Sequence, residues 1–241
     1  MAEKLPLILL LASHLFVLGV LSMSILKIEN KCNHTVWPVL YSWKSQVSTT
    51  GFTLRQGEAR VINAPSSWYG LISGRTLCST DSTGNFLCAT GDCESGKIEC
   101  PGTYSWAPVT YVYFRIDNNG INSHTISVEY GYNLPLMVVP SHRSRTCTSS
   151  SCVVDINKTC PNDLLQQFKE NPIACSSACQ KSNTPETCCT RDFKSKQNCK
   201  PTVYTKNFER ACPLAQIYAY DDNKSTITCS NSTDYVITFC P

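Results

Sequence analysis

After residue 24 the sequence has few histidines, and none lies at a zinc-like spacing from a cysteine pair. They are His34, His124 and His142, whereas protein zinc sites are usually built from closely spaced pairs such as C-x2–4-C. The chain also lacks a polybasic run and a serine in a G-x-S-x-G motif. These absences argue against a metal or other cofactor, against nucleic-acid binding and against α/β-hydrolase chemistry.

Long apolar stretches are also rare, and the exception lies at the N-terminus. Residues 5–21 are largely apolar, follow Lys4 and lead into the small residues Ser22 and Ser24. A membrane-spanning helix needs about 20 apolar residues, so the pattern predicts a cleaved secretory signal peptide over residues 1–24. No hydrophobic tail for a lipid anchor follows. We therefore expect the remaining chain to be secreted and extracellular.

Cysteine is abundant, with 16 residues that all follow the predicted signal. An even number in a chain bound for an oxidising compartment predicts disulfides. The neighbours Cys188–Cys189 rarely reach the geometry of a bridge to each other, so each should bond elsewhere. The sequence by itself leaves the pairing open. The competing metal site would be drawn from Cys78, Cys88, Cys93 and Cys100, but zinc-binding thiolate pairs are typical of reducing compartments.

Four sequons are candidate glycosylation sites on the surface of a secreted protein. Asn33 follows Cys32 directly, so a nearby disulfide could hinder its use. The four sequons begin at Asn33, Asn157, Asn223 and Asn231.

Short β-branched and aromatic segments bounded by turn residues predict an antiparallel two-sheet sandwich. These segments are residues 34–41, 59–64, 109–116, 124–130 and 234–240.

Side chains should alternate between two faces in the segment 109–116. The even positions form a mostly apolar face that we predict as core, and they are Thr110, Val112, Phe114 and Ile116. The odd positions form a solvent or ligand face, and they include Tyr111, Tyr113 and Arg115.

The stretch from Cys147 to Cys212 holds nine of the cysteines. Pro161 suits a first helical turn and Asn171-Pro172 a stop, which predicts a helix over residues 161–170. A second helix is expected near residues 207–215, and the rest should be disulfide-tied loops. Residues 141–212 also carry 11 Lys and Arg against 6 Asp and Glu, an excess that could favour an anionic cell surface.

The run "GNFLCATGDCESGKIEC" at residues 84–100 resembles the signature of the thaumatin family. The segments "KIENKC", "GYNLPL", "CPNDL", "ETCCT", "CPLA" and "YVITFCP" occur in the family's order. The chain is therefore identified as similar to plant thaumatin-like proteins of pathogenesis-related group five.

That resemblance implies a mainly β fold, with a thaumatin-like two-sheet antiparallel β-sandwich, a disulfide-rich helical lobe and a small looped subdomain. The sandwich would comprise residues 25–146 plus 213–241, the lobe residues 147–212 and the subdomain residues 78–100. The implied disulfide pairs are Cys32–Cys240, Cys78–Cys88, Cys93–Cys100, Cys147–Cys229, Cys152–Cys212, Cys160–Cys175, Cys179–Cys188 and Cys189–Cys199.

The resemblance also implies a ligand-binding cleft, which in many family members is acidic and is built from one Arg, one Glu and three Asp. Arg75 and Asp221 match two of these positions. The other three positions fall on Tyr113, Thr125 and Tyr130. Three of four family carboxylates are thus replaced, and the cleft should be less acidic than in the family.

A one-residue shift in the alignment would let Glu129 replace one of the missing carboxylates, and Asp222 neighbours Asp221. Glycoside hydrolysis needs two suitably spaced carboxyl groups, so we expect no enzyme activity. Two other residues are expected to be structural. Asp92 should bond nearby backbone in a turn, and His124 should be an ordinary strand residue.

The leading hypothesis is a monomeric, apoplastic defence protein with antifungal action. It would bind fungal cell-wall β-1,3-glucan or perturb fungal membranes through this cleft, where tyrosine faces suit sugar rings. One alternative is a weak endo-β-1,3-glucanase that uses Asp221 with Glu129 or Asp222. The other is an inhibitor of a microbial hydrolase.

Overall fold

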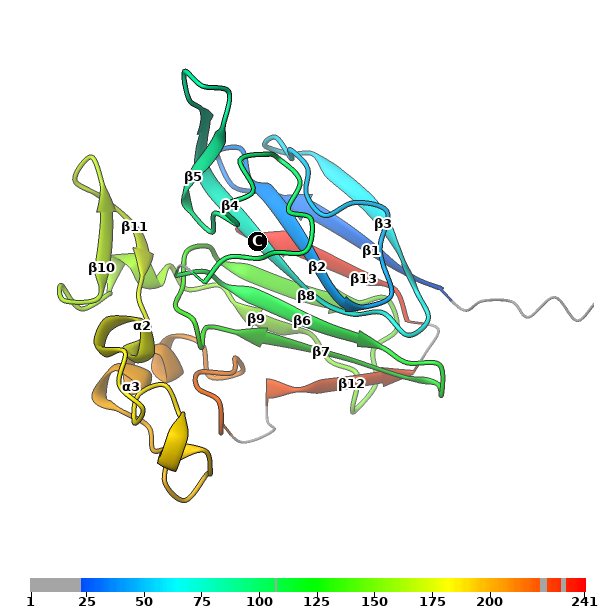
Figure 1. The fold of residues 1–241 in the computed structure, drawn as a ribbon. Coiled ribbons are helices and arrows are strands. Elements are labelled where there is room, and N and C mark those ends of the chain that lie inside the picture. Colours follow the sequence, from blue (N-terminus) through cyan, green and yellow to red (C-terminus); the bar gives the residue numbers. More distant parts are fainter. Residues whose placement is uncertain (1–22, 107, 222–224, 231–232) are drawn as a thin grey trace, which may run out of the picture.

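The computed structural model describes residues 23–106, 108–221, 225–230 and 233–241, and two β-sheets dominate these residues (Figure 1). One sheet has the strand order β3-β1-β13-β8-β9. The other has the order β12-β7-β6-β4-β2, with β5 paired to β4. The ladders within both sheets are antiparallel except the parallel pair β1 and β13. The prediction of a mainly β, two-sheet sandwich is confirmed.

The predicted strands are present, with ends that differ by up to three residues. The first sheet consists of β1 (Met23–Asn30), β3 (Ala59–Pro65), β8 (Leu136–Pro140), β9 (Ser150–Cys152) and β13 (Tyr235–Phe239). The second consists of β2 (Trp37–Lys44), β4 (Tyr69–Thr80), β6 (Tyr111–Ile116), β7 (Ile121–Ser127) and β12 (Ile227–Ser230), with β5 (Phe86–Thr90) beside β4. Strand β9 lies in the segment expected to be lobe, yet it pairs with β8.

Strand β1 begins inside the predicted signal peptide. Ser24 is fully buried, and its Oγ accepts a hydrogen bond from Asn122 Nδ2 at 3.1 Å. The side chains of Leu26 and Ile28, also fully buried, point into the core. A signal boundary after residue 24 would therefore remove two residues of a paired strand.

The sandwich core lies between the two sheets, where alternate residues of each strand meet. In β6 the predicted core residues Val112, Phe114 and Ile116 are at most 3% exposed, and Thr110 just before the strand is 1% exposed. Val112, Phe114 and Ile116 pack in one cluster with residues of β1 and β13. The core prediction for the even positions is confirmed. The prediction of a solvent or ligand face is wrong for Tyr111, which is fully buried and whose hydroxyl donates to Ser105 O.

The predicted helix over residues 161–170 is wrong. The structure has a hairpin there, made of β10 (Leu165–Phe168) and β11 (Asn171–Cys175). Lys169 and Glu170 between the strands both have positive φ, of 48° and 66°, as a two-residue type I′ hairpin turn requires. Helix propensity was overridden by this turn and by the disulfide that ties Cys175 to Cys160.

The helices of the lobe are short. Helix α3 (Val203–Ala211) begins earlier than the predicted 207–215 because the Thr202 side chain caps it by accepting from Thr205 N. Helix α2 (Ala178–Ser182), which was not predicted, begins with a capping box between Ser177 and Gln180. Two 3-10 turns, η1 (Ile156–Lys158) and η2 (Arg191–Phe193), complete the lobe's helical content.

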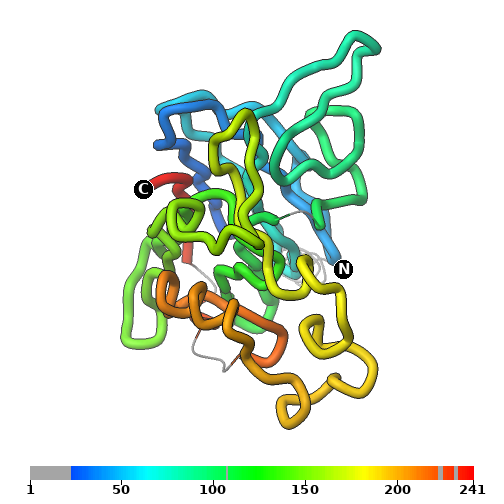
Figure 2. Tube along the Cα trace, turned by 90° about the vertical axis from the view of Figure 1, so that its left-hand side faces the viewer, coloured from blue at the N-terminus to red at the C-terminus, as the bar shows by residue number. Residues whose placement is uncertain are grey.

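The helices α2 and α3 and the β10–β11 hairpin lie together on one side of the sandwich, the left in Figure 1 and nearest the viewer in Figure 2. Within the described part of the chain, no helix is both long and apolar enough to cross a membrane.

All 16 cysteines form disulfides, which excludes the four-cysteine metal site. The eight pairs are those that the family resemblance implied. Cys188 and Cys189 bond to different partners, as expected for neighbours. The bridge between Cys32 and Cys240 ties the N-terminal strands to the last strand.

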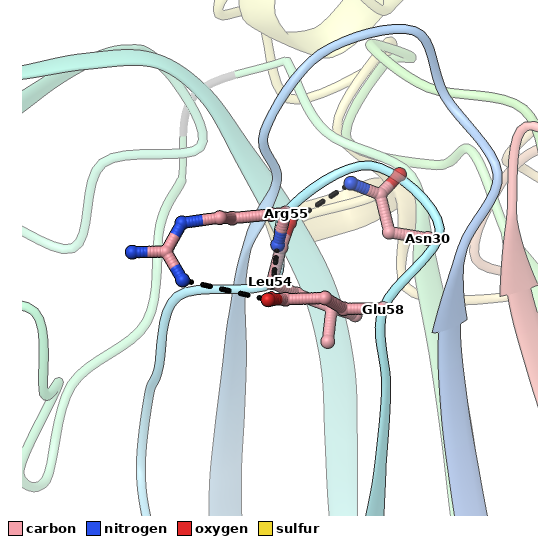
Figure 3. A network of polar contacts seen from close by, with 4 residues as sticks. All are labelled: Asn30, Leu54, Arg55 and Glu58. Carbon is pink, nitrogen blue, oxygen red and sulfur yellow. Dashed lines mark hydrogen bonds and ion pairs between the residues drawn. The ribbon is translucent and has the colours of Figure 1, made fainter.

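The loop after β2 is held by polar contacts to the end of β1 (Figure 3). Asn30 Nδ2 donates to Leu54 O at 2.9 Å. Arg55 N donates to Glu58 Oε2 at 2.7 Å, and the two side chains also form an ion pair at 3.4 Å. These contacts close the turn that leads into β3.

Candidate functional site

The site lies on the face of the second sheet that points away from the core. Cross-strand pairing aligns Tyr41 with Leu71, Leu71 with Tyr113, and Tyr113 with Thr125. Residues directly opposite in antiparallel strands share a face, so these side chains form a row across four strands. At the end of the row, Thr125 Oγ1 lies 3.0 Å from the Oγ1 of Thr226.

A cavity of about 770 Å³ covers this face, and we call it the aromatic cleft. Its aromatic lining comprises Trp43, Tyr69, Tyr104, Tyr113 and Tyr130, and it also borders Trp68 and Phe114, which are buried in the core cluster. Its polar and charged lining includes Lys44, Arg115, Asp117, Ser123, Thr125, Glu129, Gln216 and Thr226. The cleft thus brings together residues of β2, β4, β6 and β7 with five connecting segments.

The rings of the cleft form a continuous array. Trp43 and Tyr69 stack with their ring centroids 4.8 Å apart, and Trp43 lies 6.0 Å from Tyr113. Tyr104 lies 5.8 Å from Trp43 and continues the array to Trp106, at 5.0 Å. The rings of Trp43, Tyr69 and Trp106 are 40%, 44% and 61% exposed. Parts of these three side chains are therefore accessible to a ligand.

Glu129 supplies a carboxyl group to the cleft. Burial raises the pKa of Glu129 to about 7, and no neighbouring carboxylate contributes to that shift. Its Oε2 accepts a hydrogen bond from Gln216 Nε2 at 3.2 Å. Burial and, as a smaller effect, the Glu129 carboxyl raise the pKa of Tyr130 to about 12. At mildly acidic pH the cleft therefore presents a neutral acid beside neutral phenols.

The turn that carries Glu129 is fixed by the sequence "SVEYG". Glu129 N donates to Ser127 Oγ at 3.2 Å, and Gly131 N donates to Val128 O at 2.9 Å. Gly131 has φ +89°, and a Cβ there would lie 2.6 Å from Cys175 O. Only glycine fits, because both the backbone conformation and the close approach exclude a side chain.

Four of the six residues predicted for the ligand-binding cleft meet in it. They are Tyr113, Thr125, Glu129 and Tyr130. Arg75 and Asp221 do not line it.

Arg75 is fully buried under the small looped subdomain. Its guanidinium donates to the carbonyl oxygens of Trp37, Lys97 and Ile98, and burial lowers its pKa to about 10. The arginine therefore holds the loop closed by the Cys93–Cys100 disulfide against the sheet.

Asp221 lies beside α3. Its Oδ2 accepts a hydrogen bond from Ile217 N at 3.0 Å, and it lines a separate cavity of about 160 Å³ with Thr205 and Glu209. Asp222, the other predicted partner, lies outside the described residues.

The two residues expected to be structural lie away from the cleft. The carboxylate of Asp92 accepts hydrogen bonds from Cys88 N at 2.6 Å and Glu94 N at 2.8 Å. His124 is buried in β7 between the rings of Phe114 and Tyr235, and burial lowers its pKa to about 4. Both placements agree with the expectation.

Sequence reasoning missed four rings of the cleft array. Trp43 continues the alternation of β2 two residues after Tyr41, so the period of a strand could have found it. Tyr69 sits at the start of β4, a strand that was not predicted. Tyr104 and Trp106 belong to a loop, and no local pattern indicates that this loop folds over the sheet.

The candidate glycosylation sites differ in their surroundings. Asn33 is exposed and Asn157 is half-buried. Asn223 and Asn231 lie outside the described residues.

Comparison with known proteins gives a family match over most of the chain. The model described as "Thaumatin family" matches residues 30–241. A PR5-like receptor kinase of Arabidopsis thaliana is 51% identical over 246 residues, which cover 99% of this chain and 37% of that protein. The chain thus spans little more than a third of that relative's length.

Two further proteins are similar over their whole length. A glucan endo-1,3-beta-glucosidase of Prunus avium is 37% identical over 245 residues, covering 100% of both chains. The solved structure of the thaumatin-like xylanase inhibitor TLXI matches with a TM-score of 0.50 and 20% identity, covering 90% of this chain and 99% of that one. At that identity the structural match supports a shared fold and nothing more.

Proposed function

The chain belongs to the thaumatin family, and from that premise we propose that it is an extracellular, non-catalytic defence protein. Its aromatic cleft would bind the β-1,3-glucan of fungal cell walls. The extracellular destination is supported by the cysteines, all of which are paired in disulfides, since such bridges form and persist in oxidising compartments.

The observation that carries the proposal is the array of exposed rings around Trp43 and Tyr69. Sugar rings present apolar C–H faces, which pack on flat aromatic faces, while the phenol hydroxyls remain free for hydrogen bonds. Thr125 and Gln216 add polar groups in the same cavity. A volume of about 770 Å³ lies within the range of ligand-binding clefts.

The carboxyl groups of the cleft do not favour hydrolysis. A retaining glycosidase needs two carboxyls about 5–5.5 Å apart and an inverting one roughly 6.5–9.5 Å. Among the described residues, Glu129 and Asp117 are the carboxyl groups that line the cleft. Asp117 also lines the cleft but pairs with Arg115 at 3.3 Å. Asp117 follows the end of β6 where Ile116 pairs with Asn122, whereas Glu129 lies beyond the opposite end of the β6–β7 pair, where Tyr111 pairs with Ser127.

Sedimentation with insoluble β-1,3-glucan tests the binding function, with cellulose as the control polysaccharide. We expect the double variant Trp43→Ala, Tyr69→Ala to bind about tenfold more weakly, since each aromatic contact contributes about 0.5–1.5 kcal/mol. The matched control is Leu87→Ala, an equally exposed apolar residue on β5 outside the cleft. Undiminished glucan binding by the double variant would remove the cleft from the proposal.

The alternative functions give different results in the same preparation. Release of reducing ends from soluble β-1,3-glucan, abolished by Glu129→Gln, would establish a weak glucanase like the relative named as a glucosidase. Leakage from lipid vesicles without glucan binding would establish membrane perturbation. A stoichiometric complex with a microbial hydrolase would establish an inhibitor.

A further inference from the structure

A second cavity of about 770 Å³ lies outside the aromatic cleft, and we call it the hairpin cavity. One wall is the β10–β11 hairpin with Phe168. Leu77 of β4 and the loop that carries Asn33 also line the cavity. Asn157 of η1 also lines it. Two of the sequons in the chain therefore border one cavity.

Two apolar side chains of this cavity are unusually exposed. Phe168 is 43% exposed and Leu77 is 47% exposed. Leu77 has φ +53° and falls between the β4–β5 pairs of Thr76 with Thr90 and Cys78 with Cys88. A positive φ is uncommon for a non-glycine residue, and the pairing register is the same on both sides of Leu77. Exposed apolar groups gathered around a hollow indicate a surface that something covers.

Asn33 is positioned at the rim of the hairpin cavity by its neighbours. Asn30 donates to His34 O at 2.8 Å and accepts from Cys32 N at 2.9 Å, so the residues on both sides of Asn33 are fixed. Asn33 itself is exposed, and its Oδ1 contacts His34 Nδ1 at 2.9 Å. Among the described residues its Nδ2 has no hydrogen-bond partner. The nitrogen that would carry a sugar is thus free.

Asn157 has the opposite environment. Its Nδ2 donates to Asn133 O at 3.0 Å and to Ile173 O at 3.3 Å, so both amide hydrogens are used. N-glycosylation replaces one of these hydrogens by a sugar carbon. The folded protein would then lose a hydrogen bond in a half-buried site, and the sugar would displace a carbonyl that helps to hold the hairpin.

We propose that Asn33 carries an N-linked glycan whose first sugars lie over the hairpin cavity, and that Asn157 is unmodified. This inference depends on the proposed extracellular route. In the transfer, Nδ2 bonds to the anomeric carbon of the sugar and loses one proton to the medium. The bond between that carbon and a lipid-linked pyrophosphate donor breaks, and the lipid pyrophosphate leaves with the electron pair. The sugar faces then cover Phe168 and Leu77.

Glycopeptide mapping of the full chain secreted from a eukaryotic host tests the assignment. Removal of N-glycans by a peptide N-glycosidase leaves an aspartate, and the mass difference marks each used site. We expect the mark at Asn33 and none at Asn157. Thr35→Ala should abolish the mark at Asn33, whereas the matched variant Thr35→Ser keeps the sequon and should retain it. An unmodified Asn33 or a glycan on Asn157 in the secreted protein would overturn the proposal.

Hydrogen exchange tests whether the glycan covers the cavity. Amides of residues 165–175 should exchange several-fold faster after enzymatic removal of the glycan, while those of α3 should not change. Equal exchange in the hairpin before and after removal would refute the covering. Glucan sedimentation of Thr35→Ala should match that of the parent protein. A failure of the glycan proposal is therefore distinguishable from a failure of the cleft proposal.

Discussion

The two faces of the sheet β12-β7-β6-β4-β2 are made by alternate residues of the same strands, yet they differ in packing. In β6 the side chains of Val112 and Phe114 are closed into the sandwich core. Their neighbours Tyr113 and Arg115 line an open cleft. Strand alternation separates the two roles by a single residue. The core face tolerates little change in volume, whereas the cleft face is free to vary its chemistry.

The faces also differ in what burial does to an ionisable group. On the core face, burial lowers the pKa of His124 to about 4. Just beyond the end of the same strand, in the cleft, burial raises the pKa of Glu129 to about 7. In each case the neutral form is favoured, because burial penalises the charged form. The two groups therefore make the stability of the protein depend on pH in opposite directions.

The largest expected difference between the faces is in packing. Phe114→Ala should lower the free energy of unfolding by about 3–5 kcal/mol, because it leaves a cavity in the core. The matched control on the other face, Arg115→Ala, should change it by less than about 0.5 kcal/mol. Denaturant unfolding measures both. Similar losses for the two variants would contradict the distinction between the faces.

The next effect is the pH dependence of stability. The pKa of His124 in the folded protein lies below its ordinary value of 6.5. The contribution of this residue to the free energy of unfolding is therefore lost as pH falls from 6.5 towards 4. The folded pKa of Glu129 lies above its ordinary value of 4.5, so its contribution is lost as pH rises from 4.5 towards 7. Each amounts to at most about 3 kcal/mol, and between pH 4.5 and 6.5 they oppose each other.

Replacing one of these two groups should reveal the pH dependence that the other gives to stability. Glu129→Gln should steepen the loss of stability on acidification below pH 6.5. His124→Phe should remove that loss, so that stability falls only as pH rises towards 7. Phenylalanine suits the site because neither ring nitrogen of His124 has a partner among the described residues. Denaturant unfolding across this pH range measures both slopes. Parallel pH profiles for the two variants would be inconsistent with the opposite shifts.

A smaller effect on stability is expected at Arg75, on the cleft side of the sheet. Arg75 follows the alternation of Tyr69 and Leu71 along β4 but is buried under the loop 93–100. Arg75→Met should cost about 2 kcal/mol, since hydrogen bonds to charged groups contribute about 1.5–3 kcal/mol. Hydrogen exchange should show the loss concentrated in that loop. The control is the exposed Lys97→Ala, and an equal effect there would contradict the role given to the guanidinium.

The smallest expected effect is at Tyr113. Tyr113→Phe should leave the free energy of unfolding within about 0.5 kcal/mol, because the ring stays in place. Glucan binding should weaken by no more than about tenfold, the value of one lost hydrogen bond. Sedimentation compared with Tyr113→Ala separates the hydroxyl from the ring. Equal binding by the two variants would show that the ring itself contributes nothing.

Most of the fold could be predicted from local patterns and from one specific signature. The period-two pattern of residues 109–116 identified the core face correctly because burial of one sheet face acts on every second residue. The signature at residues 84–100 implied the disulfide pairs, which spacing alone left open. The hairpin at β10–β11 was missed because its turn residues, Lys169 and Glu170, carry no Gly or Asn to signal positive φ.

The site was predictable only in part. All six predicted cleft residues came from alignment with the family. Four of them line the same cavity because they lie on β6, on β7 or in the turn that follows β7, and they are Tyr113, Thr125, Glu129 and Tyr130. Alignment with the family placed Arg75 and Asp221 beside them, although hydrogen bonds hold the one under a loop and the other beside α3. The partners of a polar side chain are set by whatever packs over it, which a linear motif does not specify.

The sequence by itself determined the class of fold, the disulfide pairing implied by the signature, and which side of β6 is buried. Those features depend on short-range periodicity or on a motif shared across the family. Only the tertiary structure decided that Trp43, Tyr69, Tyr104 and Trp106 form one array with Tyr113. These rings come from two strands and a loop that are far apart in the chain. Their juxtaposition depends on strand register and on how a loop folds over the sheet, and neither leaves a local pattern.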